Sequence, residues 1–291
     1  MPIRVNLNGK IVPAEEARIS VLDHGLIFGD SIYETLRTYR GRPFLFSRHF
    51  ARLEHSADGV QLQLRWSKED IRREVERTLA SEPQGPHGEE SRIRVMVTRG
   101  AGPLSLDTET TTDPSLIIIV VPLKEVPSET YERGVAVIVS SIRRSRLLAD
   151  IKSGSLIRQV LAFSEVKSKQ TFEAILLTEE GYLSDGITSN IYVVEGNRLM
   201  TPSPEAGIVA GITRGVVLDL ARNMGLDVVE GLFPPGEMDH ADEMFLTSTT
   251  REVVPIVSVD GKTVGSGRPG PVALALLKSY RASIAALLEE G

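Results

Sequence analysis

Three short blocks decide how this chain is interpreted: SDGITSNIY (Ser184–Tyr192), LMTP (Leu199–Pro202) and GIVAGITR (Gly207–Arg214). Together they supply an acid, a strand, a turn and a glycine-flanked helix start. Exposed backbone N–H groups and the helix dipole at such a start favour a phosphate group. With Asp185 at its other end, the stretch predicts a site that grips a phosphorylated heterocycle at both ends.

Bulk composition sets broad limits on the protein. The 291 residues are 41% hydrophobic and 25% charged, which is typical of a globular protein long enough for two domains. The net charge of −6 argues against a nucleic-acid partner, because such proteins usually carry a basic excess. The chain has no cysteine, which excludes disulfides, thiolate catalysis and zinc-thiolate sites.

Targeting and membrane signals are weak. The start, Met1 to Arg4, has no hydrophobic signal region, and the longest apolar run, Leu116 to Val121, is too short to span a bilayer. We therefore expect a soluble, cytoplasmic protein with no membrane partner, no nucleic-acid partner and no metal site.

The first part of the chain alternates strand and helix signals. Residues 5–12 alternate around Asn8-Gly9, which predicts a β-hairpin, and residues 32–39 predict a strand leading into a second hairpin. Apolar residues every three or four positions predict a helix over 47–60, and Ser67 fits the N-cap of another. Further strands are expected over 92–98 and 116–122.

The second part mixes strands and helices without strict alternation. We expect strands over 135–140, 174–178, 182–184, 191–194 and 244–247, and helices over 156–168, 213–224 and 272–288. This order favours an α+β fold over a doubly wound sheet. Prolines and acids place a linker at 123–133, between an N-terminal α+β domain (1–122) and a C-terminal domain (134–291).

Lys152 is the candidate nucleophile. The chain has eight lysines against twenty-five arginines, and Lys152 lies between apolar residues and the small Ser153-Gly154-Ser155. Burial makes a lysine amine available as a nucleophile. From spacing alone, a surface lysine at a strand end is the commoner interpretation.

Other site signals also have plain alternatives. Thr247–Thr250 places four hydroxyl residues after an apolar strand, which suggests a second phosphate contact. The Asp185-Gly186 pair is often only a turn. Arg52 lies on a predicted helix, and an isolated arginine on a helix is usually solvated.

The ordered blocks resemble the class IV (fold type IV) pyridoxal-phosphate aminotransferases, closest to branched-chain amino acid aminotransferase-like members. The matching blocks span nearly the whole chain: Phe28–Glu34, Asp150–Ser153, Ser184–Asn190, Gly211–Thr213 and Gly265–Val272. The resemblance implies a two-domain fold like that of D-amino acid aminotransferase, with a β-barrel-like core in the C-terminal domain. It also implies pyridoxal 5'-phosphate (PLP) as cofactor and a homodimer or a higher homo-oligomer.

The resemblance also assigns cofactor roles. Lys152 would carry PLP and move the proton between the α-carbon and the cofactor's C4′. Asp185 would keep the pyridine nitrogen protonated, although the family has Glu there, one methylene longer. The remaining cofactor-binding residues implied are Arg52 and Thr249 at the phosphate, with Ser189, Asn190, Gly211, Ile212, Thr213 and Ser248.

Substrate recognition needs a cation for the α-carboxylate, and the fork of an arginine fits it best. Arg94 and Arg99 are the candidates, with Tyr33 in the pocket wall and Thr250 near the carboxylate. The family's D-amino-acid branch has Arg-x-His in the next loop, where this chain has Leu-Ser-Leu at 104–106. The branched-chain branch has an arginine where Arg94 stands.

The resemblance therefore implies a ping-pong transaminase that moves the amino group of an L-branched-chain or apolar amino acid to a 2-oxo acid. Arg92 and Leu156-Ile157 stand where that branch usually has tyrosine and Asn-Tyr, so the pocket diverges. Thr35 matches the aminodeoxychorismate-lyase branch. Lyase, D-amino-acid transaminase and (R)-amine transaminase activities thus stay open, as does a PLP-binding protein without turnover.

Overall fold

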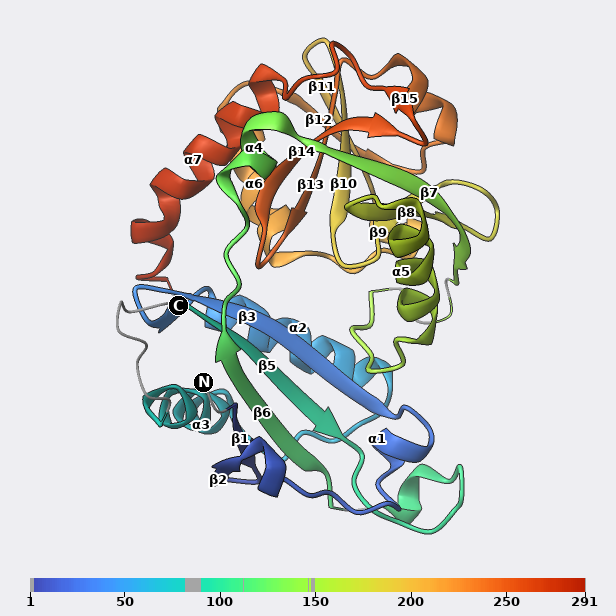
Figure 1. The fold of residues 1–291 in the computed structure, drawn as a ribbon. Coiled ribbons are helices and arrows are strands. Elements are labelled where there is room, and N and C mark those ends of the chain that lie inside the picture. Colours follow the sequence, from blue (N-terminus) through green and yellow to red (C-terminus); the bar gives the residue numbers. More distant parts are fainter. Residues whose placement is uncertain (1–2, 82–89, 112, 146, 148–149, 291) are drawn as a thin grey trace. The chain divides into compact units, whose positions relative to one another are not determined.

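The computed structural model describes residues 3–81, 90–111, 113–145, 147 and 150–290, and the chain forms two compact units (Figure 1). Unit 1 comprises Met1–Lys124, Ile151–Ser155 and Ala285–Gly291; unit 2 comprises Glu125–Asp150 and Leu156–Ile284. Gly, Pro and Glu residues in the sequence predict a surface loop at 81–90, and this segment lies almost entirely outside the described residues, as do Leu148 and Ala149.

Unit 1 is built on a six-stranded antiparallel sheet in the order β2-β1-β6-β5-β3-β4. Asn8 and Gly9 both have positive φ, 51° and 86°, as the two-residue turn between β1 and β2 requires. The predicted first hairpin is thus confirmed. The strands are β1 (Arg4–Leu7), β2 (Lys10–Pro13), β3 (Ser31–Tyr39), β4 (Arg42–Pro43), β5 (Ser91–Thr98) and β6 (Ser115–Pro122).

Two helices pack on this sheet, α2 (Phe46–Gly59) and α3 (Lys68–Ala80). Ser67 caps α3 as predicted: its hydroxyl accepts from the Asp70 N–H, and Asp70 accepts from the Ser67 N–H. The second predicted hairpin extends only to Pro43, because Leu45 is left-handed (φ 50°) and the chain turns into α2. The short helices are α1 (His24–Ile27), η1 (Ala14–Glu16) and η2 (Thr108–Thr110).

Unit 2 contains a nine-stranded mixed sheet in the order β12-β11-β10-β13-β14-β7-β8-β9, with β15 paired to β14. Parallel pairs join β11 to β12, β14 to β7 and β7 to β8. The strands are β7 (Val135–Arg144), β8 (Glu173–Thr178), β9 (Leu183–Gly186), β10 (Asn190–Glu195), β11 (Arg198–Pro202), β12 (Asp227–Gly231), β13 (Glu243–Ser248), β14 (Glu252–Val259) and β15 (Lys262–Thr263).

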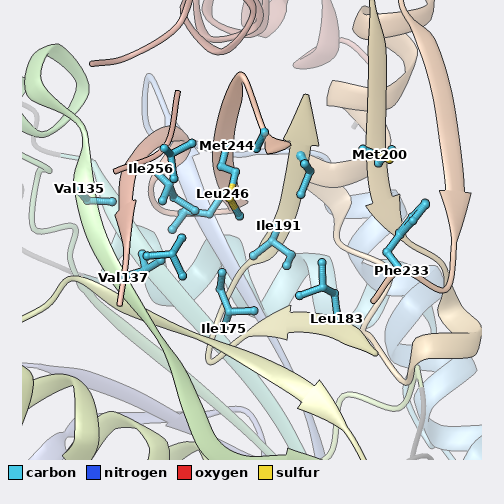
Figure 2. Packing of buried hydrophobic residues seen from close by; sticks show 14 of the residues in the cluster. Val135, Val137, Ile175, Leu183, Ile191, Met200, Phe233, Met244, Leu246 and Ile256 are labelled. Atoms are coloured by element: carbon cyan, nitrogen blue, oxygen red, sulfur yellow. The ribbon is translucent and has the colours of Figure 1, made fainter. Parts of the chain in front are cut away.

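Buried side chains from most of these strands share one apolar core (Figure 2). Ile175, Leu183, Ile191 and Leu246 gather in it from β8, β9, β10 and β13. This core fixes the positions of the strand ends that carry the site residues below.

The helices of the second part are α4 (Ser128–Arg133), α5 (Ile157–Lys169), α6 (Ile212–Asn223) and α7 (Pro271–Leu287), with η3 (Pro204–Ala206) and η4 (Pro235–His240). The last three α-helices lie where the sequence predicts them, within one residue at each end. In the described part of the chain, no helix is both long and apolar enough to cross a membrane.

Candidate cofactor and substrate site

Lys152 lies on a segment that is tied into unit 1 by backbone hydrogen bonds. Its N–H donates to the Ser56 hydroxyl (3.1 Å), and its carbonyl accepts from the Tyr33 N–H (2.9 Å). The Gly154 N–H donates to the Ser31 carbonyl at 2.7 Å, and a Cβ on Gly154 would lie 2.1 Å from the Ser31 hydroxyl oxygen. The small residue after the lysine therefore allows the segment to approach β3 closely.

Two cations share the ring of Tyr33. Lys152 Nζ lies 4.6 Å from the ring centroid and Arg94 Cζ lies 4.0 Å from it. The Arg94 Nε is buried and has no hydrogen-bond partner among the described residues. A buried donor without an acceptor is costly, so this atom marks a place where a ligand oxygen would be favoured. The structure thus brings three predicted residues together: Tyr33, Arg94 and Lys152.

Arg52 belongs to a buried cluster with Glu34 and His49. Glu34 is 1% exposed and accepts at 2.7 Å from Arg52 Nε, Arg52 Nη2 and His49 Nδ1. Burial alone would raise the pKa of Glu34, but the charge and hydrogen bonds of Arg52, with those of His49, outweigh it and hold the pKa well below its usual range. Glu34 therefore fixes the orientation of the predicted phosphate arginine.

His49 in this cluster is favoured as a neutral imidazole. Burial lowers its pKa; the hydrogen bond and charge of Glu34 act in the opposite direction, and the charges of Arg52 and Lys152 lower it further. A neutral ring with its proton on Nδ1 donates to Glu34.

Arg99 has a different environment from Arg94. It is 7% exposed, pairs with Asp30, and donates to the carbonyls of Val60 (2.7 Å) and Gln61 (2.9 Å). These contacts use its guanidinium to hold the turn after α2. We therefore leave Arg99 out of the substrate site proposed below.

Asp185 lies at the end of β9 beside an arginine that the sequence did not single out. Its Oδ2 is 3.6 Å from Arg144 Nη2 and accepts weakly from the Val209 N–H (3.4 Å). Arg144 Nε donates to the Gly207 carbonyl at 2.8 Å. The carboxylate is 5% exposed and its position is set by the chain just before α6.

The start of α6 forms a cradle that only glycine fits. Gly211 is the N-cap of α6, and no side chain caps the helix start. A Cβ on Gly211 would lie 2.1 Å from Asn190 Oδ1, while Asn190 Nδ2 donates to the Val209 carbonyl at 3.0 Å. Uncapped N–H groups at the start of a twelve-residue helix, with Thr213 beside them, are suited to a phosphate.

The hydroxyl residues after β13 form a tight turn. The Arg251 N–H donates to the Ser248 carbonyl at 3.3 Å, which places Thr249 and Thr250 at the tip. Ser189, on the connection from β9 to β10, donates to Glu173 at 3.3 Å. Ser248 Oγ lies 3.1 Å from Arg251 Nε.

Sequence reasoning missed five polar residues that hold these groups: Glu34, His49, Arg144, Glu173 and Arg251. Arg144 belongs to a short basic run, Arg143–Arg146, whose sequence fits a solvated loop equally well. The others show no local signal, because their partners are distant in sequence.

The residues present fit PLP. Lys152 offers an amine, Asp185 a carboxylate for a ring nitrogen, and the cradle at Gly211 a place for a phosphate. The orphaned Arg94 Nε suits a substrate carboxylate.

Comparison with known proteins agrees with this set of groups. The profile of the family described as amino-transferase class IV matches residues 31–259. A putative branched-chain-amino-acid aminotransferase of Methanocaldococcus jannaschii is 32% identical over 96% of both chains, and a D-alanine aminotransferase of Bacillus licheniformis is 33% identical over 93% of both. The branched-chain aminotransferase of Thermoproteus uzoniensis, solved with norvaline, superposes with a TM-score of 0.89, at 28% identity over 100% of this chain and 97% of that one.

The predicted α+β, fold type IV architecture is confirmed by this superposition. The family match covers the strand that carries Glu34, the lysine block, the Asp185 block and the turn after β13. The family model that matches residues 31–259 and the relative that is 32% identical over 96% of both chains show that this chain is a member of the class IV aminotransferases, a family of PLP-dependent enzymes.

Proposed function

We propose that this protein is a transaminase that uses PLP to move the amino group of an L-branched-chain or apolar amino acid to a 2-oxo acid. The observation that carries the proposal is the buried, unpartnered Arg94 Nε on the same tyrosine ring as Lys152. A carboxylate that accepts from Arg94 would leave the amino group of the same small molecule near the lysine amine. An amino acid carries both groups on one carbon.

The cofactor, when bound, supplies the electron sink that an α-carbon needs to lose its proton. Lys152 then holds and moves that proton as general base and general acid. Asp185 would accept from the ring nitrogen and keep it protonated. In unit 2, the start of α6 with Thr213, Ser248 and Thr249 would bind the phosphate, and Ser189, Asn190 and Ile212 are further proposed cofactor contacts. In unit 1, Arg52 is a proposed phosphate ligand.

The preference for apolar L-amino acids is supported by the sequence of the loop that follows β5. The loop after β5 offers Leu104-Ser105-Leu106, which lacks the second cation and the histidine of the D-amino-acid branch. The putative branched-chain relative supports the same choice. Thr250, at the tip of the turn, is the remaining proposed contact of the substrate carboxylate.

D-amino-acid transamination is the second candidate, because a D-alanine aminotransferase is equally similar in sequence. Lyase activity is the third, because Thr35 stands directly opposite Arg94 in the β3–β5 register. All of these activities would use the same lysine; D-amino-acid transamination differs from the first candidate in the substrate, and lyase activity differs in the reaction itself.

We also propose a homodimer. Large apolar side chains are exposed in unit 1, among them Val21 (75%), Leu104 (76%) and Leu106 (83%). A second copy of the chain could bury these side chains and so remove apolar surface from water. Sedimentation of the purified protein would give the oligomeric state directly.

The test is a half-reaction without an amino acceptor. The protein is purified with PLP and mixed separately with L-leucine, D-alanine and (R)-1-phenylethylamine, and the absorbance of the bound cofactor is followed. We expect L-leucine alone to bleach it. Bleaching by D-alanine or by the (R)-amine would move the assignment to those branches. Full turnover by Lys152→Ala would refute the role of the lysine.

A further inference from the structure

Arg251 is a charged side chain in the turn after β13 that the proposed reaction does not use. Its Nη2 donates to Glu173 Oε2 at 2.8 Å and to Thr188 Oγ1 at 2.7 Å, and its Nε donates to Ser248 Oγ at 3.1 Å. One guanidinium therefore bonds to three different chain segments of unit 2: the start of β8, the β9–β10 connection and its own turn.

Glu173 makes this arrangement rigid. The carboxylate is 3% exposed and also accepts from the hydroxyls of Ser189 (3.3 Å) and Thr188 (3.4 Å). A buried carboxylate needs a partner charge, and Arg251 supplies it at 2.8 Å. The pair thus joins the connection that carries Ser189 to the turn that carries Ser248, Thr249 and Thr250.

The direction of the hydrogen bonds has a chemical consequence. A guanidinium can only donate, so the Ser248 oxygen must accept from Arg251 Nε. The single hydroxyl hydrogen of Ser248 is then left to donate to another acceptor. The same guanidinium, donating to Thr188, directs the Thr188 hydrogen towards Glu173. The bond from Arg251 therefore keeps the Ser248 O–H from pointing at the guanidinium and leaves it available to an acceptor on another side.

We propose that Arg251 is a positioning residue for phosphate binding: by donating to the Ser248 oxygen, it leaves the Ser248 hydroxyl hydrogen free to donate to the phosphate of the cofactor. The inference rests on the proposed function, because it needs PLP as the ligand. Arg251 acts through Ser248 and does not itself touch the cofactor.

The experiment measures the PLP dissociation constant of the apoprotein by absorbance titration. Arg251→Lys keeps the charge opposite Glu173, but a single ammonium cannot reproduce the planar fork that reaches Ser248 and Thr188 together. We expect PLP binding to weaken about tenfold, the size of one charge-assisted hydrogen bond. The matched control is Arg222→Lys, an exposed arginine of α6, which should bind PLP as the wild type does.

A double-mutant cycle with Ser248→Ala separates positioning from general loosening of the fold. If Arg251 acts through Ser248, Arg251→Lys should change the dissociation constant less than about twofold in the Ser248→Ala background. An equal loss in both backgrounds, or no loss in either, would overturn the proposal. Thermal unfolding of each variant confirms that the titrations compare folded proteins.

PLP binding by the wild type and the role of Arg251 can be tested separately. A wild-type protein that takes up no PLP would refute the proposed function. A wild-type protein that binds PLP tightly, with Arg251→Lys binding equally well, would leave that function intact and refute only the role of Arg251.

Discussion

Glu34→Gln is the substitution whose effect the structure determines best. The wild-type carboxylate offers two oxygens to three donors, Arg52 Nε, Arg52 Nη2 and His49 Nδ1, all at 2.7 Å. Glutamine has one oxygen and an NH2 group that can only donate. At least one of the three donors would therefore face another donor in a buried site, and the charge of Arg52 would lose its partner.

The size of the expected loss in the free energy of unfolding follows from the burial of Glu34 and Arg52. The side chain of Glu34 is 2% exposed and that of Arg52 is 9% exposed, so solvent compensates little. Breaking a buried ion pair by removing one partner costs about 3–5 kcal/mol, because the remaining charge stays buried. We expect the free energy of unfolding of unit 1 to fall by that amount. Glu54→Gln, an exposed carboxylate on the same helix as Arg52, should change it by less than about 0.5 kcal/mol.

The assay uses the single tryptophan. Trp66 packs against the core of unit 1, so its fluorescence during urea titration reports that unit alone. The reasoning would be refuted by a loss below about 1 kcal/mol for Glu34→Gln, a value expected for an exposed pair.

The cluster of Glu34, Arg52 and His49 also predicts how the free energy of unfolding changes with pH. The folded state holds the pKa of Glu34 below its usual range, so its contribution to stability is complete above the unfolded pKa of about 4.3 and is lost as the pH falls towards the folded value. The stability difference between wild type and Glu34→Gln should therefore shrink below about pH 4. A constant difference down to about pH 2 would contradict this account.

Three further substitutions test the site directly. Lys152→Ala should lower turnover at least about a hundredfold while PLP can still bind, as measured by steady-state rates and equilibrium dialysis. Arg94→Lys should raise the KM for L-leucine about tenfold with little change in protein stability, because an ammonium cannot reproduce the guanidinium fork. Gly211→Ala should weaken PLP binding about tenfold, because its Cβ would meet Asn190 Oδ1 at 2.1 Å; Asn190→Ala in the same protein should restore part of the loss in an absorbance titration.

The sequence predicted correctly those turns and helix caps whose interacting groups lie close together along the chain. The Asn8-Gly9 turn and the Ser67 cap each involve groups only a few residues apart, so the sequence contains the whole interaction. The short β4 was less predictable, since the left-handed Leu45 that ends it is buried in the core of unit 1. Tertiary packing decides that conformation, and no local pattern shows it.

The residues of the site show the same difference between local and distant interactions. Lys152, Asp185 and Gly211 each show a local feature: a rare lysine, an acid before glycine, and a glycine before a helix. For Lys152 and Asp185 these features alone favour plainer interpretations, and the resemblance to the class IV aminotransferases gave them their predicted roles. Glu34 and Arg251 were missed because Glu34 bonds to Arg52 eighteen positions away and Arg251 to Glu173 seventy-eight positions away. Such partners become neighbours only through the sheet topology, which composition and periodicity do not contain.

The path of the chain through the two units limits how the protein could be divided. It passes from one unit to the other at Lys124/Glu125, Asp150/Ile151, Ser155/Leu156 and Ile284/Ala285, so Ile151–Ser155 is an island of unit 1 within the sequence of unit 2. A gene fragment that ends after Lys124 would leave the Tyr33 N–H and the Ser56 hydroxyl without the lysine segment they bind. A fragment that ends after Lys124 therefore does not encode all of unit 1, and forming that unit requires the segment Ile151–Ser155 as well.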